Sequence, residues 1–457
     1  MVLFVVGQIS DLFTYLFFYK NYPFRDRDGY VPIYSRIESL YIRRAYTYIE
    51  DCFNRPICGY PSKYIDVVDR EYDRATKRVT PNGKTVRLLN LGSYNYLGLA
   101  TGDSPTIEKV LMSVDTLPIS LAGSLADVGA HGVVKELESA FADFLHQEDC
   151  LVFPMGFATN TCTIPVLTDV GDLIISDEYN HSSIIYGSRL SRACVKTFPH
   201  NNVRELEKTL RYWISQGQPV SHKAWRRVFV LTEGIYSMEG TILRLPEILE
   251  LKRRYKFYLF IDEAHSVGAM GATGRGICEY FGADFRDVDI LMGTFSKSFN
   301  GVGGYIAGSR RVVGFLRQRC DATRYGEQLS PVVAKQVLEA LRYLQSEEGR
   351  RLPGVLRENS IYMRERLLDM GYVICGTRDS PVIPLMICTP GKVGEFSRLC
   401  KERGLAVVIV GHPATSVFTC RARLCMSALF GRSDIDVAIR IIDDVGRILG
   451  LRASRQR

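Results

Sequence analysis

The stretch Gly293-Thr294-Phe295-Ser296-Lys297-Ser298-Phe299 places a lysine after the apolar run Asp289-Ile290-Leu291-Met292 and before the glycine-rich Gly301-Val302-Gly303-Gly304. The apolar run predicts a buried strand, so Lys297 comes at a strand end. A lysine there is costly unless its charge is used or removed. A desolvated lysine amine is suited to capture an aldehyde by bonding to its carbon. Most lysines lie in surface loops. The upstream sequence decides whether Lys297 is such a surface lysine or a desolvated lysine that binds an aldehyde.

A second apolar run ends in an acid. Phe257-Tyr258-Leu259-Phe260-Ile261 predicts a fully buried strand, and Asp262-Glu263-Ala264-His265-Ser266 follows it. In open α/β sheets, ligands bind at the carboxyl ends of the strands. An aspartate at one strand end and a lysine at another, about 35 residues later, suit pyridoxal phosphate. The aspartate keeps the pyridine nitrogen protonated, and the lysine holds the aldehyde carbon.

Two other interpretations of Asp-Glu-Ala-His were considered. The aspartate could simply cap a helix. The motif could also be the DEAH box of a helicase, which requires a phosphate loop of the form GxxxxGK[ST]. The Gly-Lys-Thr of this chain is Gly83-Lys84-Thr85, and Arg78 stands where the first glycine belongs. The helicase interpretation is therefore excluded.

Further strand ends carry polar groups. Cys150-Leu151-Val152-Phe153 predicts a short strand, and Met155 to Asn160 turns into a helix that begins near Gly156. A glycine at a helix start lets backbone N–H groups approach an anion, which the helix dipole favours. His181 follows another apolar run, and Ser237 follows a third. Because helix-length segments separate these strand ends, we expect them to form one pocket.

The order of elements predicts an α/β fold. From about residue 106 to 308, apolar strands alternate with helical stretches such as Val203–Trp213 and Leu245–Tyr255, which indicates a mostly parallel sheet with flanking helices. Helical periodicity returns in Val332–Gln345, and the last part mixes strands and helices, as in a smaller α+β domain. The predicted units are an N-terminal hydrophobic segment, an arm, a large cofactor domain and a small domain, at residues 1–28, 29–100, 101–329 and 330–457.

Composition limits the possible partners. The formal net charge is +8 and is spread along the chain, which makes nucleic acid a poor partner but suits the phosphates of coenzyme A or an anionic membrane. The twelve cysteines include no CxxC pair. We interpret them as reduced thiols of a protein that faces the cytosol, and we expect no metal site.

The N-terminus is apolar. Val2 to Tyr19 is interrupted by only a few polar residues and is followed by basic ones. Spanning a membrane needs roughly 20 apolar residues, so this segment is marginal and could instead lie in the interface. A cleaved signal peptide is disfavoured, because no basic region precedes the run and no small-residue cleavage site follows it. A helix packed on the protein's own core is the remaining alternative.

Together these motifs resemble the α-oxoamine synthases, a family of fold-type I pyridoxal phosphate enzymes. Within it they are most similar to the catalytic, long-chain-base-2-type subunits of serine palmitoyltransferases. The resemblance runs from about Gly29 to Leu451. It is carried by Asn54-Arg55-Pro56-Ile57, Leu91-Gly92-Ser93-Tyr94-Asn95-Tyr96-Leu97-Gly98, Gly156-Phe157-Ala158-Thr159-Asn160, Glu233-Gly234-Ile235-Tyr236-Ser237-Met238-Glu239-Gly240, Asp262-Glu263-Ala264-His265-Ser266, the Lys297 motif and Pro413-Ala414-Thr415.

The resemblance implies roles around the cofactor ring. Lys297 would bond the aldehyde and later serve as the base that removes the substrate's α-proton. Asp262 would pair with the pyridine nitrogen. His265 would bind the phenolic oxygen, with Ser237 near it, and His181 would stack on the ring.

It also implies roles around the phosphate and the substrate. Thr294 and the amides of Gly156 and Phe157 would hold the phosphate. Arg423 would bind the carboxylate of the amino acid, because a guanidinium matches a carboxylate with two parallel hydrogen bonds. Asn95 would lie near the substrate.

The implied reaction is the decarboxylating condensation of L-serine with a long-chain acyl-CoA, palmitoyl-CoA, to 3-ketosphinganine, the first step of sphingolipid synthesis. A family member that uses glycine or a short acyl-CoA, and a non-catalytic scaffold subunit, are the alternatives. The relatives imply attachment to the endoplasmic reticulum membrane, with the catalytic body facing the cytosol.

Several positions depart from the family pattern. Leu125 stands where an arginine is usual, and Val134 where a histidine is usual. Asn300 replaces a glycine. Because asparagine tolerates a left-handed backbone better than most residues, we expect this change to be mild. Glu327 and Gln328 replace a Thr or Ser pair that reaches the partner's phosphate in homodimers. Because a glutamate repels phosphate, we expect a heterodimer with a non-catalytic, long-chain-base-1-type subunit.

Overall fold

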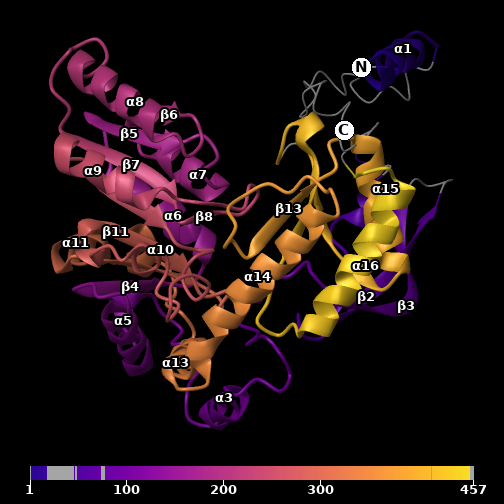
Figure 1. The fold of residues 1–457 in the computed structure, drawn as a ribbon. Coiled ribbons are helices and arrows are strands. Elements are labelled where there is room, and N and C mark those ends of the chain that lie inside the picture. The colour runs from indigo at the N-terminus through magenta and orange to yellow at the C-terminus, as the bar shows by residue number, and fades with distance from the viewer. Residues whose placement is uncertain (1, 18–45, 47–48, 74–77, 413, 453–457) are drawn as a thin grey trace.

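The structure is a computed structural model that describes residues 2–17, 46, 49–73, 78–412 and 414–452. Figure 1 shows two units side by side, connected through α13 (Pro331–Gln345) and α14 (Leu352–Asp369). Among the described residues, the larger unit is built on a seven-stranded sheet in the order β4-β12-β11-β10-β7-β5-β6. In that order the strands are Asp149–Phe153, Gly304–Gly308, Ile290–Thr294, Tyr258–Asp262, Arg227–Glu233, Asp172–Asp177 and Cys194–Phe198.

All these strands run parallel except β12, which is antiparallel to both neighbours. Helices cover both faces of the sheet, so neighbouring strand residues enter different cores. Leu173 and Ile175 belong to one buried cluster and Ile174 to another. Burial on both faces explains the continuous apolar runs in the sequence. The predicted α/β fold with a mostly parallel sheet and flanking helices is therefore confirmed.

The helices of this unit divide between the two faces. The first cluster includes side chains of α5 (Gly132–Phe144), α8 (Val203–Gln216), α9 (Leu245–Tyr255) and α13. The second includes side chains of α6 (Gly156–Leu167), α7 (Ser182–Leu190) and α11 (Arg310–Arg319). Shorter elements of this unit are α3 (Ile107–Val114), α4 (Leu125–Val128), β8 (Ile235–Tyr236), β9 (Thr241–Ile242), α10 (Ile277–Phe281) and α12 (Asp321–Arg324).

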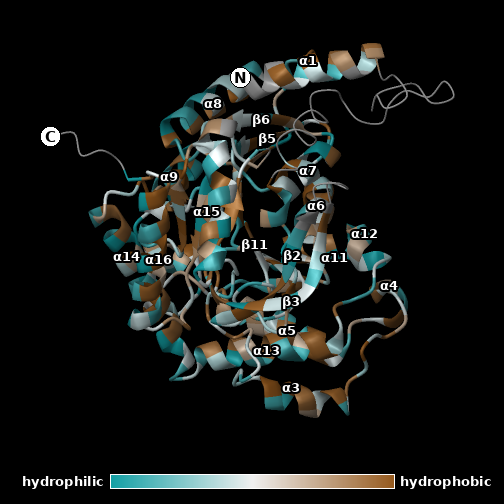
Figure 2. Ribbon diagram, turned by 90° about the vertical axis from the view of Figure 1, so that its right-hand side faces the viewer, coloured by the Kyte–Doolittle hydropathy of each residue, from teal (hydrophilic) through white to brown (hydrophobic). Residues whose placement is uncertain are grey.

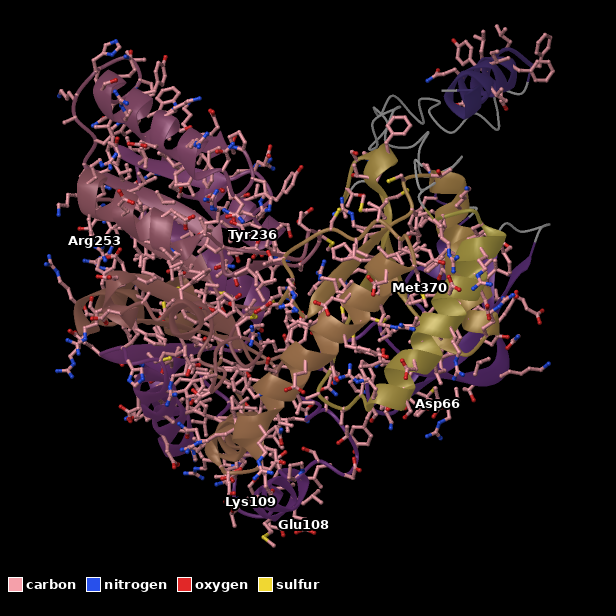
Figure 3. All side chains as sticks on the ribbon, in the orientation of Figure 1. Asp66, Glu108, Lys109, Tyr236, Arg253 and Met370 are labelled. Carbon is pink, nitrogen blue, oxygen red and sulfur yellow. The ribbon has the colours of Figure 1, made fainter. Side chains whose placement is uncertain are left out.

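The smaller unit is built from both ends of the described chain. Its antiparallel sheet has the order β13-β16-β15, at Val382–Met386, Arg421–Cys425 and Val408–Val410, and it packs with α14, α15 (Pro390–Glu402) and α16 (Arg432–Ile448). A second sheet joins β1 (Ile57–Cys58), β2 (Tyr64–Asp73) and β3 (Arg78–Asn90) to β14 (Leu405–Ala406). Figure 3 shows Asp66 of β2 in the same unit as Met370, which follows α14.

The segment Leu91–Leu99 carries the chain from the smaller unit to the larger one. Leu91 accepts a hydrogen bond from the Cys425 N–H at 2.9 Å, and Tyr96 accepts one from the Ala428 N–H at 2.8 Å. Leu97 and Leu99 are then buried in the core of the larger unit. This crossing brings two aromatic residues beside the strand ends. Residues 18–45 of the predicted hydrophobic segment and arm lie outside the described residues.

The fold accommodates two departures from the family pattern. Asn300 has a φ of 50° and donates from Nδ2 to the Leu99 carbonyl at 3.0 Å, so the expected tolerance of left-handed backbone is confirmed. Val134 is buried in the core of the larger unit. An apolar residue therefore suits that position.

Helix α1 (Val2–Phe17) lies apart from both units in Figure 1, and Figure 2 shows hydrophobic residues along its length. From Val6 onward its large apolar side chains are exposed, including Leu16 at 62% and Phe17 at 66%. In the part of the chain that the structure describes, no helix has both the length and the apolar character needed to span a bilayer.

Candidate active site

The carboxyl ends of four strands meet around one pocket. Strand β10 ends at Asp262, β7 ends at Glu233, β11 leads to Lys297, and β4 leads to Gly156 at the start of α6. The pocket has a volume of about 230 Å³. It is lined by Gly156, Phe157, Asn160, His181, Ser183, Glu233, Asp262, Ala264, His265, Met292, Thr294, Ser296 and Lys297. The sequence predicted most of the polar members of this set.

Asp262 is buried and is held at both oxygens. Asn160 donates from Nδ2 to Oδ2 at 2.8 Å, and the Ala264 N–H donates to Oδ1 at 2.9 Å. Asn160 also donates to Ser183 Oγ at 2.9 Å. An aspartate fixed in this way at a pocket wall can face a cationic ring nitrogen. Asn160 stands in a quoted motif, but sequence reasoning did not assign it a role.

Lys297 is half-buried, and its Nζ makes no hydrogen bond or ion pair with any described residue. Burial lowers the pKa of Lys297 to about 8, against the opposing effect of Asp262 and Glu233. An amine with this pKa is partly neutral near physiological pH. It can therefore act as a nucleophile toward an aldehyde or accept a proton.

The start of α6 forms an anion cradle. Met155 at its N-cap makes no side-chain capping bond, so the first N–H groups of the helix stay available. A Cβ on Gly156 would come within 2.6 Å of Thr294 Oγ1, so a side chain there would fill the cradle. Thr294 Oγ1 lies 2.9 Å from Ser296 Oγ, which adds a second hydroxyl. The predicted phosphate residues Gly156, Phe157 and Thr294 thus lie together.

Two histidines line the pocket in different settings. His265 is buried, and its Nδ1 lies 2.7 Å from the Tyr96 hydroxyl. Burial, followed by the charges of Lys297 and Arg423, holds the pKa of His265 well below its usual value, so this ring is neutral. His181 starts α7, and its Nδ1 lies 2.7 Å from Ser183 Oγ. Its ring is exposed to the pocket.

Arg423 lies on β16 of the smaller unit and is buried. Its Nε has no hydrogen-bond partner among the described residues, its Nη1 lies 3.6 Å from the Met238 sulfur, and the guanidinium also interacts with the side chains of Tyr94 and Cys425. A buried guanidinium without an acid is costly unless an anion joins it. Arg423 therefore has free capacity for a carboxylate.

Tyr94 connects Arg423 to the pocket. Its ring centroid lies 4.5 Å from Arg423 Cζ, 5.4 Å from Lys297 Nζ and 4.9 Å from the centroid of His265. Burial raises the pKa of Tyr94 to about 12, so the hydroxyl stays protonated. Tyr94 was not predicted as a site residue, because the only signal in the sequence was its position beside Asn95.

Asn95 and Ser237 are not among the residues that line the pocket. The Asn95 side chain accepts from the Ala100 N–H at 3.2 Å and donates to the Pro61 and Ala100 carbonyls, so it fastens its own loop. Ser237 is buried in the turn between β8 and β9, next to Met238.

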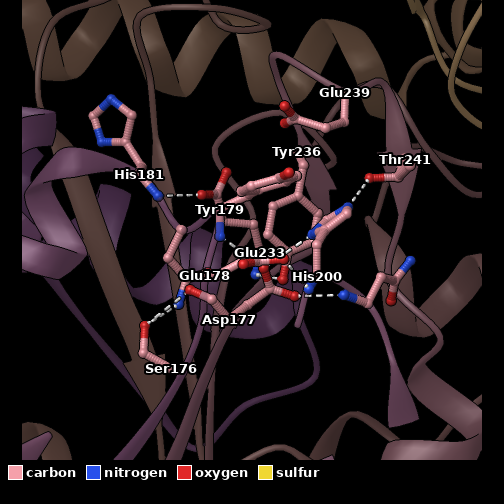
Figure 4. Close-up of polar contacts among 12 residues, drawn as sticks. Ser176, Asp177, Glu178, Tyr179, His181, His200, Glu233, Tyr236, Glu239 and Thr241 are labelled. Atoms are coloured by element: carbon pink, nitrogen blue, oxygen red, sulfur yellow. Dashed lines mark hydrogen bonds and ion pairs between the residues drawn. The ribbon is translucent and has the colours of Figure 1, made fainter. Parts of the chain in front are cut away.

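Glu233 was quoted in a motif but was not predicted as a site residue. It pairs in register with Asp262 on the adjacent strand, and its Oε1 accepts the backbone N–H of His181 (Figure 4). Burial, and then the charge of Asp262, raise the pKa of Glu233 well above its usual value. The two carboxyl groups therefore lie side by side at the pocket, and Asp262 is the one whose oxygens are both held by hydrogen bonds.

These groups fit pyridoxal phosphate. The free amine suits the aldehyde, the fixed Asp262 suits the ring nitrogen, and the uncapped helix with its hydroxyls suits the phosphate. None of these groups alone would indicate pyridoxal phosphate, but their arrangement around one pocket does.

Comparisons with known proteins agree with this geometry. The family model for aminotransferase class I and II matches residues 86–442. Serine palmitoyltransferase 2 of Dictyostelium discoideum is 45% identical over 431 residues, which is 93% of this chain and 88% of the relative. The chain belongs to the class I and II aminotransferases and, among them, to the serine palmitoyltransferase family. Long chain base biosynthesis protein 2b of Arabidopsis thaliana is 43% identical over 455 residues, 99% of this chain and 93% of its own.

A solved serine palmitoyltransferase of Sphingomonas wittichii has a similar structure. Its TM-score is 0.79 at 27% identity, covering 91% of this chain and 97% of the bacterial one. The serine palmitoyltransferase family predicted from the sequence motifs is confirmed. The roles of individual side chains remain predictions that rest on the geometry above.

If the start of α6 holds the phosphate, adding one methyl group at Gly156 should weaken cofactor binding, whereas adding one elsewhere should not. Gly156→Ala should weaken pyridoxal phosphate binding about tenfold or more, about 1.4 kcal/mol per power of ten, because its Cβ would displace Thr294 Oγ1. The matched control is Gly314→Ala in α11, where a Cβ meets nothing within 4 Å. Fluorescence titration of the cofactor-free chain measures both affinities. Equal affinity in the two variants would contradict the cradle.

Proposed function

We propose that this chain catalyses the decarboxylating condensation of L-serine with a long-chain acyl-CoA, which gives 3-ketosphinganine. The observation that carries the proposal is an unpaired Lys297 amine of lowered pKa in the pocket with a fixed Asp262. The family membership supports the same reaction, since the relatives are named serine palmitoyltransferases. An enzyme of this family requires pyridoxal phosphate.

Each part of the pocket has a proposed cofactor contact. Lys297 would bond the aldehyde, and Asp262 would hold the ring nitrogen. His265 would bind the phenolic oxygen through its free Nε2, with Tyr96 fixing the ring at Nδ1. His181 would lie on the face of the ring. When bound, pyridoxal phosphate supplies an aldehyde for the serine amine and a cationic ring that withdraws electrons from the α-carbon.

The chain's own groups handle the substrate. The amine of Lys297, with a pKa of about 8, accepts the α-proton of serine. The α-carbon then bonds the acyl carbonyl carbon, the carbon–sulfur bond breaks, and coenzyme A leaves. Loss of the carboxylate as carbon dioxide and return of a proton to that carbon complete the balance. Arg423 holds the serine carboxylate until then, because its buried guanidinium has free donors.

Removing one amine tests the function. Lys297→Ala should abolish release of labelled carbon dioxide from carboxyl-labelled serine with palmitoyl-CoA. In the absence of serine, it should also abolish the visible absorbance that arises from the bond between the cofactor and Lys297. Lys208→Ala, which removes an exposed lysine paired with Glu205, is the control and should keep both. Full turnover of Lys297→Ala would refute the proposal.

The pH dependence of cofactor uptake is a separate test. With the native chain, the rate of uptake should rise with pH and level off above about 8, because the neutral amine of Lys297 is the form that reacts.

We also propose that the chain works with a non-catalytic, long-chain-base-1-type subunit. Two observations support this. Glu327 is exposed, with its carboxylate 3.5 Å from Ser120 Oγ, so it would bring negative charge to a partner's phosphate site. The Gln328 amide is already used, accepting the His131 N–H at 2.9 Å and donating to the Gly129 carbonyl at 2.8 Å.

Native mass measurement tests this partnership. The chain co-expressed with the candidate partner should purify as a one-to-one complex with full turnover, whereas the chain alone should have little activity. Homodimers of the chain alone, with one cofactor per subunit and normal turnover, would contradict the proposal.

The third proposal concerns location: α1 lies in the interface of the endoplasmic reticulum membrane, with the catalytic body in the cytosol. Apolar side chains of α1 from Val6 onward are exposed, among them Ile9, Leu12 and Phe13. Lys20, Arg25 and Arg27 follow it in the sequence and suit the anionic cytosolic leaflet.

Vesicle flotation tests the membrane contact. The full chain should float with phosphatidylcholine–phosphatidylserine vesicles, and replacing Leu12 and Leu16 by Asp should abolish flotation. The matched control replaces the exposed Leu111 and Met112 of α3 by Asp. In sealed microsomes, added protease should digest a C-terminal tag. Unchanged flotation of the α1 variant, or a protected tag, would contradict the proposal.

A further inference from the structure

The small hairpin β8–β9 lies between the two units. Its strands pair at only two positions, Ile235 with Ile242 and Tyr236 with Thr241. A two-stranded hairpin is marginally stable by itself, so its position depends on what holds it. Figure 3 shows Tyr236 on the side of the larger unit that faces the smaller one.

A chain of hydrogen bonds holds this hairpin to the sheet of the larger unit (Figure 4). Asp177, at the end of β5, lies 2.9 Å from His200 Nδ1, and His200 Nε2 lies 2.7 Å from Thr241 Oγ1. The next residue, Asn201, donates from Nδ2 to the Ile242 carbonyl at 2.9 Å. The loop after β6 therefore grips β9 at two successive residues.

The directions of these bonds follow from the groups. A carboxylate only accepts hydrogen bonds, so Nδ1 of His200 carries the hydrogen that faces Asp177. In a neutral imidazole, Nε2 then accepts from the Thr241 hydroxyl. Asp177 also accepts the N–H groups of Tyr179 at 2.9 Å and Asn201 at 2.8 Å. These two backbone hydrogen bonds hold the Asp177 carboxylate in place, and the carboxylate in turn orients the His200 ring.

Aromatic packing restricts the His200 ring. Tyr179 stacks on it with centroids 4.8 Å apart, and Tyr236 meets it edge-on at 4.4 Å. The His200 side chain is 13% exposed, and that of Asp177 is 0% exposed. Losing the Thr241 hydroxyl would leave a nearly buried imidazole nitrogen without its partner, which is costly.

The tip of the same hairpin contacts the smaller unit. Gly240 accepts the Thr377 N–H at 2.9 Å. The Met238 carbonyl accepts from Arg421 Nη1 at 2.9 Å, and the Met238 sulfur lies 3.6 Å from Arg423 Nη1. A Cβ on Gly240 would lie 2.5 Å from the Val382 carbonyl, so the tip sits tightly against β13. Anchoring at Thr241 and the placement of Arg423 are therefore joined by one short segment.

We propose that His200 is a positioning residue for amino-acid recognition: through Thr241 it fixes the β8–β9 hairpin, and Met238 on that hairpin sets the guanidinium of Arg423 for the substrate carboxylate. The inference rests on the proposed function, because it takes Arg423 as the carboxylate-binding group. It assigns no contact between His200 and the substrate.

Binding of two amines to the full-length holoenzyme tests the proposal. L-Serine carries the carboxylate, whereas 2-aminoethanol lacks it. Thr241→Val should raise the dissociation constant of L-serine about tenfold, about 1.4 kcal/mol, and leave that of 2-aminoethanol unchanged. Thr241→Ser keeps the hydroxyl and should bind both amines normally. His200→Leu, which removes both ring nitrogens, should resemble Thr241→Val. Thr209→Val removes a hydroxyl that bonds the Glu205 carbonyl on α8, and it is the matched control.

A second measurement needs no cofactor. In the cofactor-free chain, the hairpin amides of Gly240 and Leu243, which bond the carbonyls of Tyr236 and Gly234, should exchange hydrogen faster in Thr241→Val than in Thr241→Ser. Unchanged exchange, unchanged serine binding, or equal weakening of both amines would overturn the positioning role. If the unsubstituted holoenzyme bound no L-serine, the proposed function itself would have failed, while the exchange measurement would still test the anchor.

Discussion

The site depends on one amine that is held at a strand end without an ion-pair partner in the described structure. Burial lowers the pKa of Lys297 to about 8 although Asp262 and Glu233 oppose the shift. Asp262 does not neutralise the lysine, because Asn160 and the Ala264 N–H fix its oxygens in place. Burial raises the pKa of Glu233 well above its usual value, which weakens its hold on a proton-bearing lysine. The pocket thus keeps a reactive amine and a fixed carboxylate apart, which is the separation that pyridoxal phosphate requires.

The two units divide the work. Strand ends of the larger unit supply the cofactor groups, whereas β16 of the smaller unit supplies Arg423. If Arg423 binds the substrate carboxylate as we propose, substrate recognition depends on how the two units meet. The segment Leu91–Leu99 crosses between their cores and brings Tyr94 against both Lys297 and Arg423. The β8–β9 hairpin is a further contact between the units, and its anchor at His200 lies outside the pocket.

The sequence predicted those site residues that lie close to the ends of the apolar runs. Lys297, Asp262, His181 and Gly156 could be found because each ends a strand or follows one within four residues, and parallel strand ends meet at one edge. Asn160 was missed because its partner Asp262 is 102 residues away. Tyr94 was missed because its role arises from packing between two units. The antiparallel β12 follows β11 without an intervening helix, so the chain has no crossover with which to return parallel. The pairing of β3 with β14 joins distant segments, which periodicity does not reveal.

The most direct test of this account is to locate the covalent attachment of the cofactor. The full chain is loaded with pyridoxal phosphate and reduced with borohydride, which makes a bond between the aldehyde carbon and an amine permanent. Peptide mass mapping then identifies the modified residue. The account predicts one pyridoxyl phosphate per chain, on Lys297. A label on another lysine, or a chain that carries no label after loading, would contradict it.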